Sequence, residues 1–143
     1  MTKDVSVSLN SVHYAEEEEK MSVVSFGKMT EEDDSVYIEY EDSMLEYEGN
    51  RMVKNVIAVE DGKIDIIKYD EEKTHLTFID GENTVSYYST PIGELEVVLH
   101  TRKLNIDYTN DGLNIELEYA VQIAGEMTTD ANVSIEVKEV KNA

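Results

Sequence analysis

One stretch of the sequence has the residue types and spacing of a calcium-binding loop. Asp107, Asp111 and Glu118 occupy positions 1, 5 and 12 of that loop pattern, and Gly112 occupies position 6. Such a loop needs helices on both sides to present the last carboxylate to the ion. Here the flanking residues alternate between apolar and polar types, as in strands, which would carry Glu118 far from Asp111. The pattern therefore predicts a hairpin turn and no calcium site.

The three histidines are isolated from one another. His13, His75 and His100 each lack a second histidine two to four residues away. A transition-metal site would need ligands that only the tertiary structure could bring together. We therefore predict no metal site, and we interpret each histidine as an ordinary strand residue.

Pairs of carboxylates are the remaining feature with the spacing of catalytic groups. Glu39/Glu41 and Glu116/Glu118 each place two acids on one face of a strand, which would suit a glycosidase or a metal site. The solvated face of any acidic strand has the same spacing. The chain also has no Gly-x-Ser-x-Gly elbow, no cysteine nucleophile and no glycine-rich phosphate loop. The sequence thus predicts no catalytic residues and no cofactor, and the protein is expected not to be an enzyme.

Four side chains form a hypothetical ligand-binding set. Tyr87 and Tyr119 fall in the apolar phase of their strands, which predicts that both rings point inward. His100 and Arg102 lie close together where the strand pattern is interrupted. An inward Arg102 would need a carboxylate or an anionic ligand as partner, whereas an outward Arg102 would form one more surface ion pair.

The elements that must position these residues are strands. Residues 113–123 give the cleanest alternation, and residues 4–12 show the same period of two. Further strands are predicted at residues 21–28, 36–41 and 133–137. Asp61-Gly62, Asp80-Gly81 and Asp111-Gly112 each separate two alternating runs, and such turns are typical of tight hairpins. The sequence predicts about ten strands with short connections and no helix.

Two irregularities shape the predicted sheet. Pro91 and Gly93 lie between two β-branched runs and predict a strand that ends, turns and restarts as a long strand. Within that long strand, Leu95, Val97 and Leu99 are in one phase, whereas Leu104 and Ile106 are in the other. An extra residue between His100 and Lys103 accounts for the change and predicts a β-bulge.

An open sheet of this size would leave two long unpaired edges, so closure into a barrel is the favoured architecture. The prediction is all-β: a single antiparallel meander β-barrel of about 8–10 strands, occupying residues 1–143 as one domain. A two-sheet sandwich is the alternative, but the long crossover connections of a Greek key are not found after residue 50.

The charge is strongly negative, with 32 acidic and 12 basic residues and a formal net charge of −20. Residues 1–50 carry 14 acids against 3 bases, a net charge of −11. Such a surface repels nucleic acids and anionic membranes, so neither is an expected partner. A basic protein partner is compatible with it, although solubility alone accounts for an acidic surface.

Features of the composition bear on localisation. No run of 18 apolar residues occurs, so no membrane-spanning segment is predicted. The first residues alternate instead of forming the apolar core of a signal peptide. The absence of cysteine excludes a disulfide framework. Together these features predict a cytoplasmic protein.

Three stretches resemble the YwiB-like family of small bacterial proteins. They are Val36-Tyr37-Ile38-Glu39-Tyr40-Glu41, the run from Tyr87 to Thr101 with its Gly93-x-Leu95 core, and the hairpin of residues 104–123. The resemblance covers nearly the whole chain and implies a calycin-like barrel, similar in shape to lipocalins and fatty-acid-binding proteins. It also implies an uncharacterised function. With no tryptophan, the chain lacks the Gly-x-Trp signature of true lipocalins.

Two functional hypotheses follow. In the first, the barrel interior near Arg102, His100, Tyr119 and Tyr87 receives a small apolar or amphipathic ligand, with Arg102 pairing with an acidic head group. In the second, the protein is a non-enzymatic interaction protein whose acidic surface docks a basic partner. The size of the interior discriminates between them, because a barrel filled by its own side chains leaves no room for a ligand.

Overall fold

The fold is a ten-stranded sheet. The computed structural model describes residues 2–15, 17–46, 49–69, 73–90 and 92–140, and for residues 42–46, 49–51 and 88–90 the backbone alone. The strands are β1 (Thr2–Tyr14), β2 (Glu18–Glu32), β3 (Ser35–Glu46), β4 (Gly49–Glu60), β5 (Lys63–Tyr69), β6 (Lys73–Ile79), β7 (Asn83–Thr90), β8 (Gly93–Tyr108), β9 (Gly112–Ile123) and β10 (Glu126–Glu139). The all-β prediction is confirmed. The described residues contain no helix that could cross a membrane.

The strands are connected as a meander that closes through its two terminal strands. Their order is β6-β5-β4-β3-β2-β1-β10-β9-β8-β7, and every neighbouring pair is antiparallel. β1 pairs with β10 from Val5↔Glu139 to Tyr14↔Asp130. The predicted barrel is therefore confirmed, and its open seam lies in the middle of the chain, between β6 and β7.

Asp80-Gly81 corrects one sequence expectation, because it does not join a hairpin. β6 pairs with β5 and β7 pairs with β8, so the two strands flanking this turn are the two edges of the sheet. The turn itself is tight, with Gly81 at φ 74° and the Glu82 N–H donating to the Ile79 carbonyl at 3.0 Å. An Asp-Gly turn reverses the chain, but the pairing depends on the other strands. Asp61-Gly62 and Asp111-Gly112 do join hairpins, as predicted.

The predicted β-bulge is present, and hydrogen bonds beside it bridge one end of the seam. The register between β8 and β9 shifts between Thr101 and Lys103. On the other side of β8, the Thr101 N–H donates to the Glu82 carbonyl at 3.1 Å, and the Leu104 N–H donates to Asp80 Oδ1 at 2.9 Å. The Asp80 N–H in turn donates to the Gly62 carbonyl at 3.1 Å. β8 therefore pairs with β7 as far as His100, and beyond it Thr101 and Leu104 are hydrogen-bonded to the turn that follows β6.

The predicted turn near Pro91 joins β7 to β8, although Pro91 itself lies outside the described residues. Thr90 pairs with Gly93, so the two strands form a hairpin. Gly93 has φ 126°, a conformation that favours glycine. The long strand predicted after it is β8, with 16 residues.

The two ends of the barrel differ. We call the end that carries the turns at residues 33–34, 61–62, 80–82 and 109–111 the closed end, and the opposite end the open end. Large side chains fill the closed end and are almost fully excluded from solvent, among them Ile38, Ile57, Ile64, Phe78, Leu113 and Ile115. Toward the open end, Leu9, Ile66 and Leu76 are only partly buried. The core is therefore concentrated in one half of the barrel.

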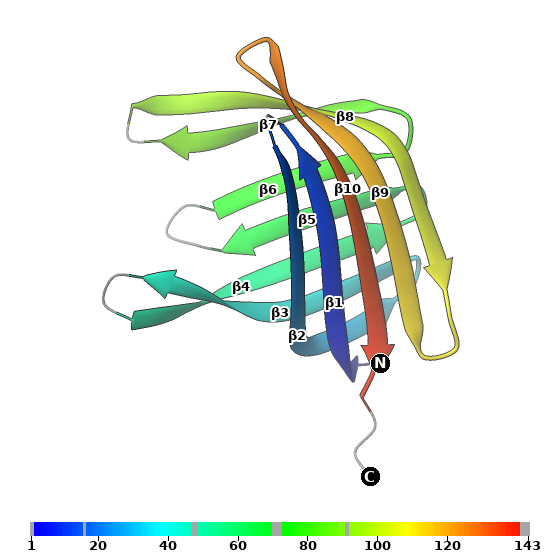
Figure 1. The fold of residues 1–143 in the computed structure, drawn as a ribbon. Coiled ribbons are helices and arrows are strands. Elements are labelled where there is room, and N and C mark those ends of the chain that lie inside the picture. The colour runs from blue at the N-terminus through cyan, green and yellow to red at the C-terminus, as the bar shows by residue number, and fades with distance from the viewer. Residues whose placement is uncertain (1, 16, 47–48, 70–72, 91, 141–143) are drawn as a thin grey trace.

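The open end spreads because neighbouring strands separate there. Within the described residues, β2 pairs with β3 from Gly27↔Tyr40 to Glu32↔Ser35, and residues 18–26 of β2 are not paired with β3. Gly27 lies where the strands diverge, and a Cβ at this position would clash with the Glu39 carbonyl and lie 2.8 Å from Tyr40 Cβ. In Figure 1, β2 runs alongside β1, whereas β3 to β6 run in a different direction, across the view.

Candidate functional site

The two tyrosines of the hypothetical ligand-binding set lie on opposite faces of the sheet. Tyr119 points inward, as predicted, and its ring centroid lies 4.8 Å from that of Phe78 at an interplanar angle of 60°. Tyr87 points outward with 60% of its surface exposed, so the prediction that it points inward is wrong.

The register of the edge strand explains the error at Tyr87. β7 places Ser86 opposite Val97 on the inner face, and therefore Tyr87 opposite Glu96 on the outer face. Ser86 is buried, whereas Val85 is 52% exposed. The long apolar phase of β8 fixes which face is inside, and β7 must follow it even though this exposes its own apolar residues.

His100 and Arg102 also lie on the outer face, so the interior site expected around them is not formed. His100 Nδ1 lies 2.8 Å from Asn83 Oδ1, and Nε2 lies 2.7 Å from Gln122 Oε1. Arg102 Nη1 donates to Asp130 Oδ1 at 3.0 Å, and both side chains are about half exposed. The bulge does not direct either polar group inward, because the extra residue only changes which side chains of β8 follow on the inner face.

The interior instead holds a cavity of 360 Å³ toward the open end. It is lined by Val7, Leu9, Met21, Val23, Ser25, Tyr40, Asn55, Ile66, Lys68, Thr74 and Leu76. These residues come from six strands, β1 to β6, and all lie on the inner face. The volume lies within the range of about 300–1,000 Å³ that is typical of small-molecule sites. None of the four residues predicted for the site lines this cavity.

One wall of the cavity carries a continuous polar row, defined here as Thr74, Lys68, Asn55 and Tyr40. The register places Thr74 opposite Lys68, Lys68 opposite Asn55, and Asn55 opposite Tyr40, so the row crosses β6, β5, β4 and β3. Directly below it, toward the closed end, the next inward row is apolar: Leu76, Ile66, Ile57 and Ile38. Asn55 is buried, and its Nδ2 donates to the Val53 carbonyl at 3.2 Å.

The opposite wall is mainly apolar. β1 and β2 contribute Val7, Leu9, Met21 and Val23, with Ser25 as the polar member. Among the described residues that line the cavity, Lys68 is the charged one and none is a carboxylate. A molecule in this space would therefore meet hydrocarbon on one side and on its floor, and hydrogen-bonding groups with one cation on the other side.

The sequence prediction missed this cavity, although two residues in the sequence indicate it. Asn55 interrupts the inward apolar phase of Val53, Ile57 and Val59, and Lys68 continues the phase of Ile64 and Ile66. A polar residue in an apolar phase indicates an interior group with a partner or a function. Nothing in the sequence shows that these positions are aligned, because the alignment depends on the register of four strands.

The charges outside the barrel form ordinary surface pairs. Lys54 Nζ lies 2.6 Å from Glu39 Oε1, and both side chains are about half exposed. The hydrogen bond from Lys54 to Glu39, with the negative charge of Glu39, raises the pKa of Lys54 above 10.5. This pair lies on the outer face, across the sheet from the polar row.

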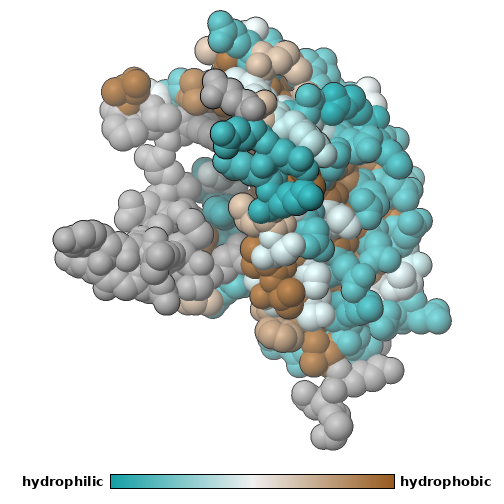
Figure 2. All heavy atoms as spheres, in the orientation of Figure 1, coloured by the Kyte–Doolittle hydropathy of each residue, from teal (hydrophilic) through white to brown (hydrophobic). Residues whose placement is uncertain are grey.

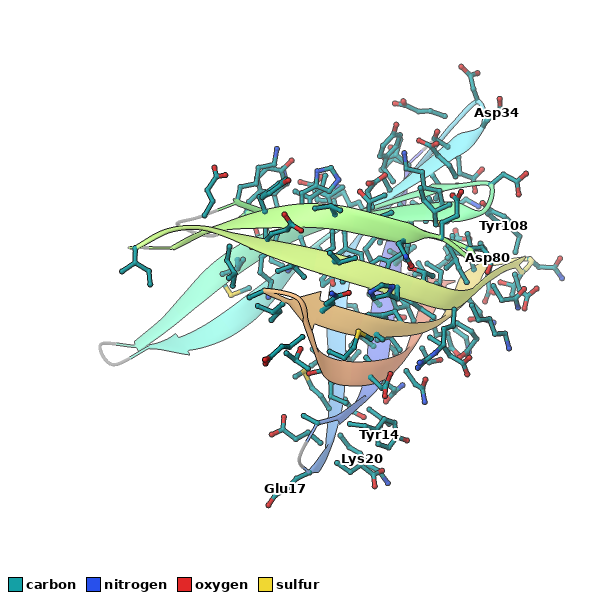
Figure 3. The ribbon with its side chains drawn as sticks, turned by 90° about the horizontal axis from the view of Figure 1, so that it is seen from above. Tyr14, Glu17, Lys20, Asp34, Asp80 and Tyr108 are labelled. Carbon is teal, nitrogen blue, oxygen red and sulfur yellow. The ribbon has the colours of Figure 1, made fainter. Side chains whose placement is uncertain are left out.

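A groove of 820 Å³ at the closed end is rich in acids, including Asp34, Glu60, Asp61 and Asp80. Figure 3 shows Asp34, Asp80 and Tyr108 around this end, away from Tyr14, Glu17 and Lys20 at the tip of the β1–β2 hairpin. Asp80 already accepts the Leu104 N–H. Within the described residues, no group of three or more histidines or acids is placed to hold a metal ion.

The calcium-like stretch forms the predicted hairpin between β8 and β9. The Thr109 N–H donates to the Gly112 carbonyl at 2.9 Å, which closes the turn. Glu118 pairs in register with Lys103, and Asp107 pairs with Asn114 near the turn. The two carboxylates are therefore separated along the hairpin.

Comparison with known proteins identifies relatives across nearly the whole chain. The uncharacterized β-barrel protein YwiB of Bacillus subtilis (strain 168) is 22% identical over 140 residues, which cover 94% of each protein. The crystal structure of that ywiB protein superposes with a TM-score of 0.80 at 18% identity, covering 98% of this chain and 94% of the other. This likeness shows the shared fold.

A family model described as a domain of unknown function, DUF1934, matches residues 5–135. The match extends from the first inward valine of β1 to β10, so it includes the strands that line the cavity and those that fill the closed end. The resemblance to YwiB-like proteins is thereby confirmed, and the chain belongs to the DUF1934 family of uncharacterised β-barrel proteins.

Proposed function

We propose that the protein is a non-enzymatic binding protein that takes a small apolar or amphipathic molecule into the cavity at the open end. The observation that carries this proposal is the 360 Å³ cavity toward the open end of a barrel whose closed end is filled by large side chains. A ligand bound there would remove its apolar surface from water. Each buried methylene group would stabilise the complex by about 0.8 kcal/mol.

The residues around the cavity also favour a bound ligand over an empty cavity. Leu9, Ile66 and Leu76 pack against the core on one side and remain partly exposed on the other. A ligand would cover these surfaces without any rearrangement of the closed end. The calycin-like shape implied by the resemblance adds an analogy of architecture, since some small barrels of this kind hold one ligand. The proposed setting is the cytoplasm, which suits a chain without cysteine.

Native mass spectrometry of the protein purified from its own host tests the proposal directly, because a bound molecule adds its mass. A thermal-shift panel of fatty acids, isoprenoids and aromatic acids then identifies the class. Ligand at a hundredfold excess over its Kd stabilises the fold by about 2.7 kcal/mol, which raises Tm by about 8 °C for a domain of this size. No added mass and no shift with any compound would contradict the proposal.

The length of the ligand gives a sharper measurement. In a series of linear amphiphiles, each added methylene should raise the affinity about fourfold while the tail still fits the cavity. Beyond that length the affinity should stop rising. A steady increase with no plateau would indicate adsorption to the surface instead of binding in a bounded cavity.

A second candidate function is the docking of a basic protein segment on β2, and a specific observation favours it. Residues 18–26 of β2 have no pairing with β3, and Val24 and Phe26 on their outer face are 65% and 71% exposed. Figure 2 shows hydrophobic atoms gathered over β2. An unpaired apolar edge is a template for strand addition. Exposed acids flank it, with Glu18 and Glu19 at one end and Glu39 and Glu41 across the gap.

Fluorescence anisotropy can test this second function with a labelled peptide of alternating valine and lysine. Binding should weaken as salt rises above about 0.15 M, where the Debye length is about 8 Å. A peptide of alternating valine and glutamate is the matched control and should not bind, and duplex DNA should not bind either. Equal binding of both peptides would contradict a role for the acidic surface.

A further inference from the structure

We propose that Lys68 selects anionic amphiphiles for the cavity by pairing with an acidic head group. This inference rests on the proposed function, and it adds the chemical class of the ligand. It also replaces the role that the sequence suggested for Arg102, which lies on the outer face and is already paired with Asp130.

The first argument is the position of Lys68 in the polar row. Lys68 lies on the inner face of β5, in the same phase as Ile64 and Ile66, and it is only partly exposed. Its neighbours across the strands are Thr74 and Asn55. Thr74 carries a hydroxyl, so a carboxylate bound by Lys68 would find a further hydrogen-bond donor beside it.

The second argument is the charge of the lining. The chain has 32 acids and 12 bases, yet no carboxylate is among the described residues that line the cavity. Lysines on the outer face pair with acids, as in Lys54–Glu39 and Lys63–Asp65. Within the described residues, Lys68 has no such pair. A partly buried cation beside hydrocarbon favours a counter-ion, and an anionic ligand would supply one.

The third argument is the arrangement of polar and apolar groups. The polar row crosses β3 to β6 at one level of the barrel, and Ile66 and Leu76 form the level below it. A head group at Lys68 would place an attached hydrocarbon tail against Ile66, Leu76 and the apolar wall of Val7 and Leu9. The geometry therefore fits a molecule with one acidic end and one apolar end.

The test compares decanoate with 1-decanol, which share a tail and differ in the charge of the head group. Isothermal titration calorimetry is performed with both ligands, below the concentrations at which they aggregate. The wild type should bind decanoate about tenfold more tightly than the alcohol. Lys68→Met keeps an unbranched apolar stem and removes the charge, so it should lose this preference and bind the alcohol at least as well as the wild type does.

Lys63→Met is the matched control, because Lys63 lies on the same strand but on the outer face. This variant should keep the tenfold preference. Circular dichroism and Tm of all three proteins verify that each is folded. Binding of the alcohol by Lys68→Met also shows that its cavity is intact, so loss of the preference cannot be attributed to unfolding.

The outcomes separate this inference from the proposed function. Equal binding of decanoate and 1-decanol by the wild type would overturn the inference and leave the binding cavity in place. A preference that survives in Lys68→Met would overturn the assignment to Lys68. Failure of both ligands to bind, together with no mass bound in the protein from its host, would overturn the proposed function and the inference with it.

Discussion

The closed and open ends of the barrel are built from the same strands, yet they are stabilised differently. On β5, Ile64 at the closed end is fully buried, whereas Ile66, the next inward residue, is partly buried and lines the cavity. At the closed end, the turn at Asp80 is bonded to Gly62 and to Leu104. At the open end, β2 and β3 separate beyond Gly27.

This difference suggests that the closed end stabilises the fold and that the open end is the part that binds. The filled core and the hydrogen-bonded turn at the closed end stabilise the fold there, because buried apolar area is the dominant favourable contribution to folding. The other end can then tolerate a cavity and an unpaired strand edge. The following predictions test whether stability and binding are separated in this way.

The largest expected effect comes from removing the same atoms at the two ends. Ile64→Ala should lower the free energy of unfolding by about 2–5 kcal/mol, because it leaves a void in a filled core. Ile66→Ala should cost less than half as much, because Ile66 already borders open space. Urea unfolding of the two variants measures both values. Equal losses would show that the two ends are packed alike.

The seam provides the next test. Asp80→Ala removes the acceptor of the partly buried Leu104 N–H and should cost about 1–3 kcal/mol. Asp61→Ala is the control, because the exposed Asp61 also precedes a turn glycine. It should change the stability by less than about 0.5 kcal/mol. Hydrogen exchange at the Leu104 amide should accelerate only in Asp80→Ala, and equal protection in both variants would argue against this role of Asp80.

Filling the cavity should affect binding more than folding. Leu76→Trp adds volume at a partly exposed lining residue, so ligand affinity should fall by at least tenfold, while Tm changes by only a few degrees. Val85→Trp on the outer face of β7 is the matched control and should leave the affinity unchanged. Calorimetry and thermal unfolding give the two readouts. An unchanged affinity in Leu76→Trp would place the ligand elsewhere.

The smallest effect is expected at Lys54 on the outer face. Folding raises the pKa of Lys54 above 10.5 through Glu39, so the pair stabilises the fold below that pH and the contribution is lost as the pH rises through the pKa of the folded state. Lys54→Met should therefore be slightly less stable than the wild type at pH 7 to 9. In thermal unfolding, the difference should shrink as the pH rises above 10.5 and through the pKa of the folded state. A difference that grows with pH would contradict the pairing.

The closed end was largely predictable from the sequence. Alternation identified the inward residues of β9, such as Leu113 and Ile115, because the side chains of a strand alternate between its two faces. The change of phase between Leu99 and Leu104 located the bulge, since an inserted residue exchanges the two faces. Both inferences need only information carried within one strand.

The pairing of the strands and the cavity depended on the tertiary structure. The sequence around Asp80-Gly81 resembles a hairpin, yet β6 and β7 became the two edges, because β1 and β10 closed the sheet elsewhere. Tyr87 was turned outward by the register of β7 against β8.

The polar row has the same origin. The sequence by itself determined the alternation, the turns and the bulge, which depend on local backbone geometry and on the type of each side chain. The sequence also has two polar residues, Asn55 and Lys68, at positions where the apolar alternation of two separate strands predicts inward side chains. Only the tertiary structure aligned them with Thr74 and Tyr40 above an unfilled space, because register between strands is set by the packing of the whole barrel.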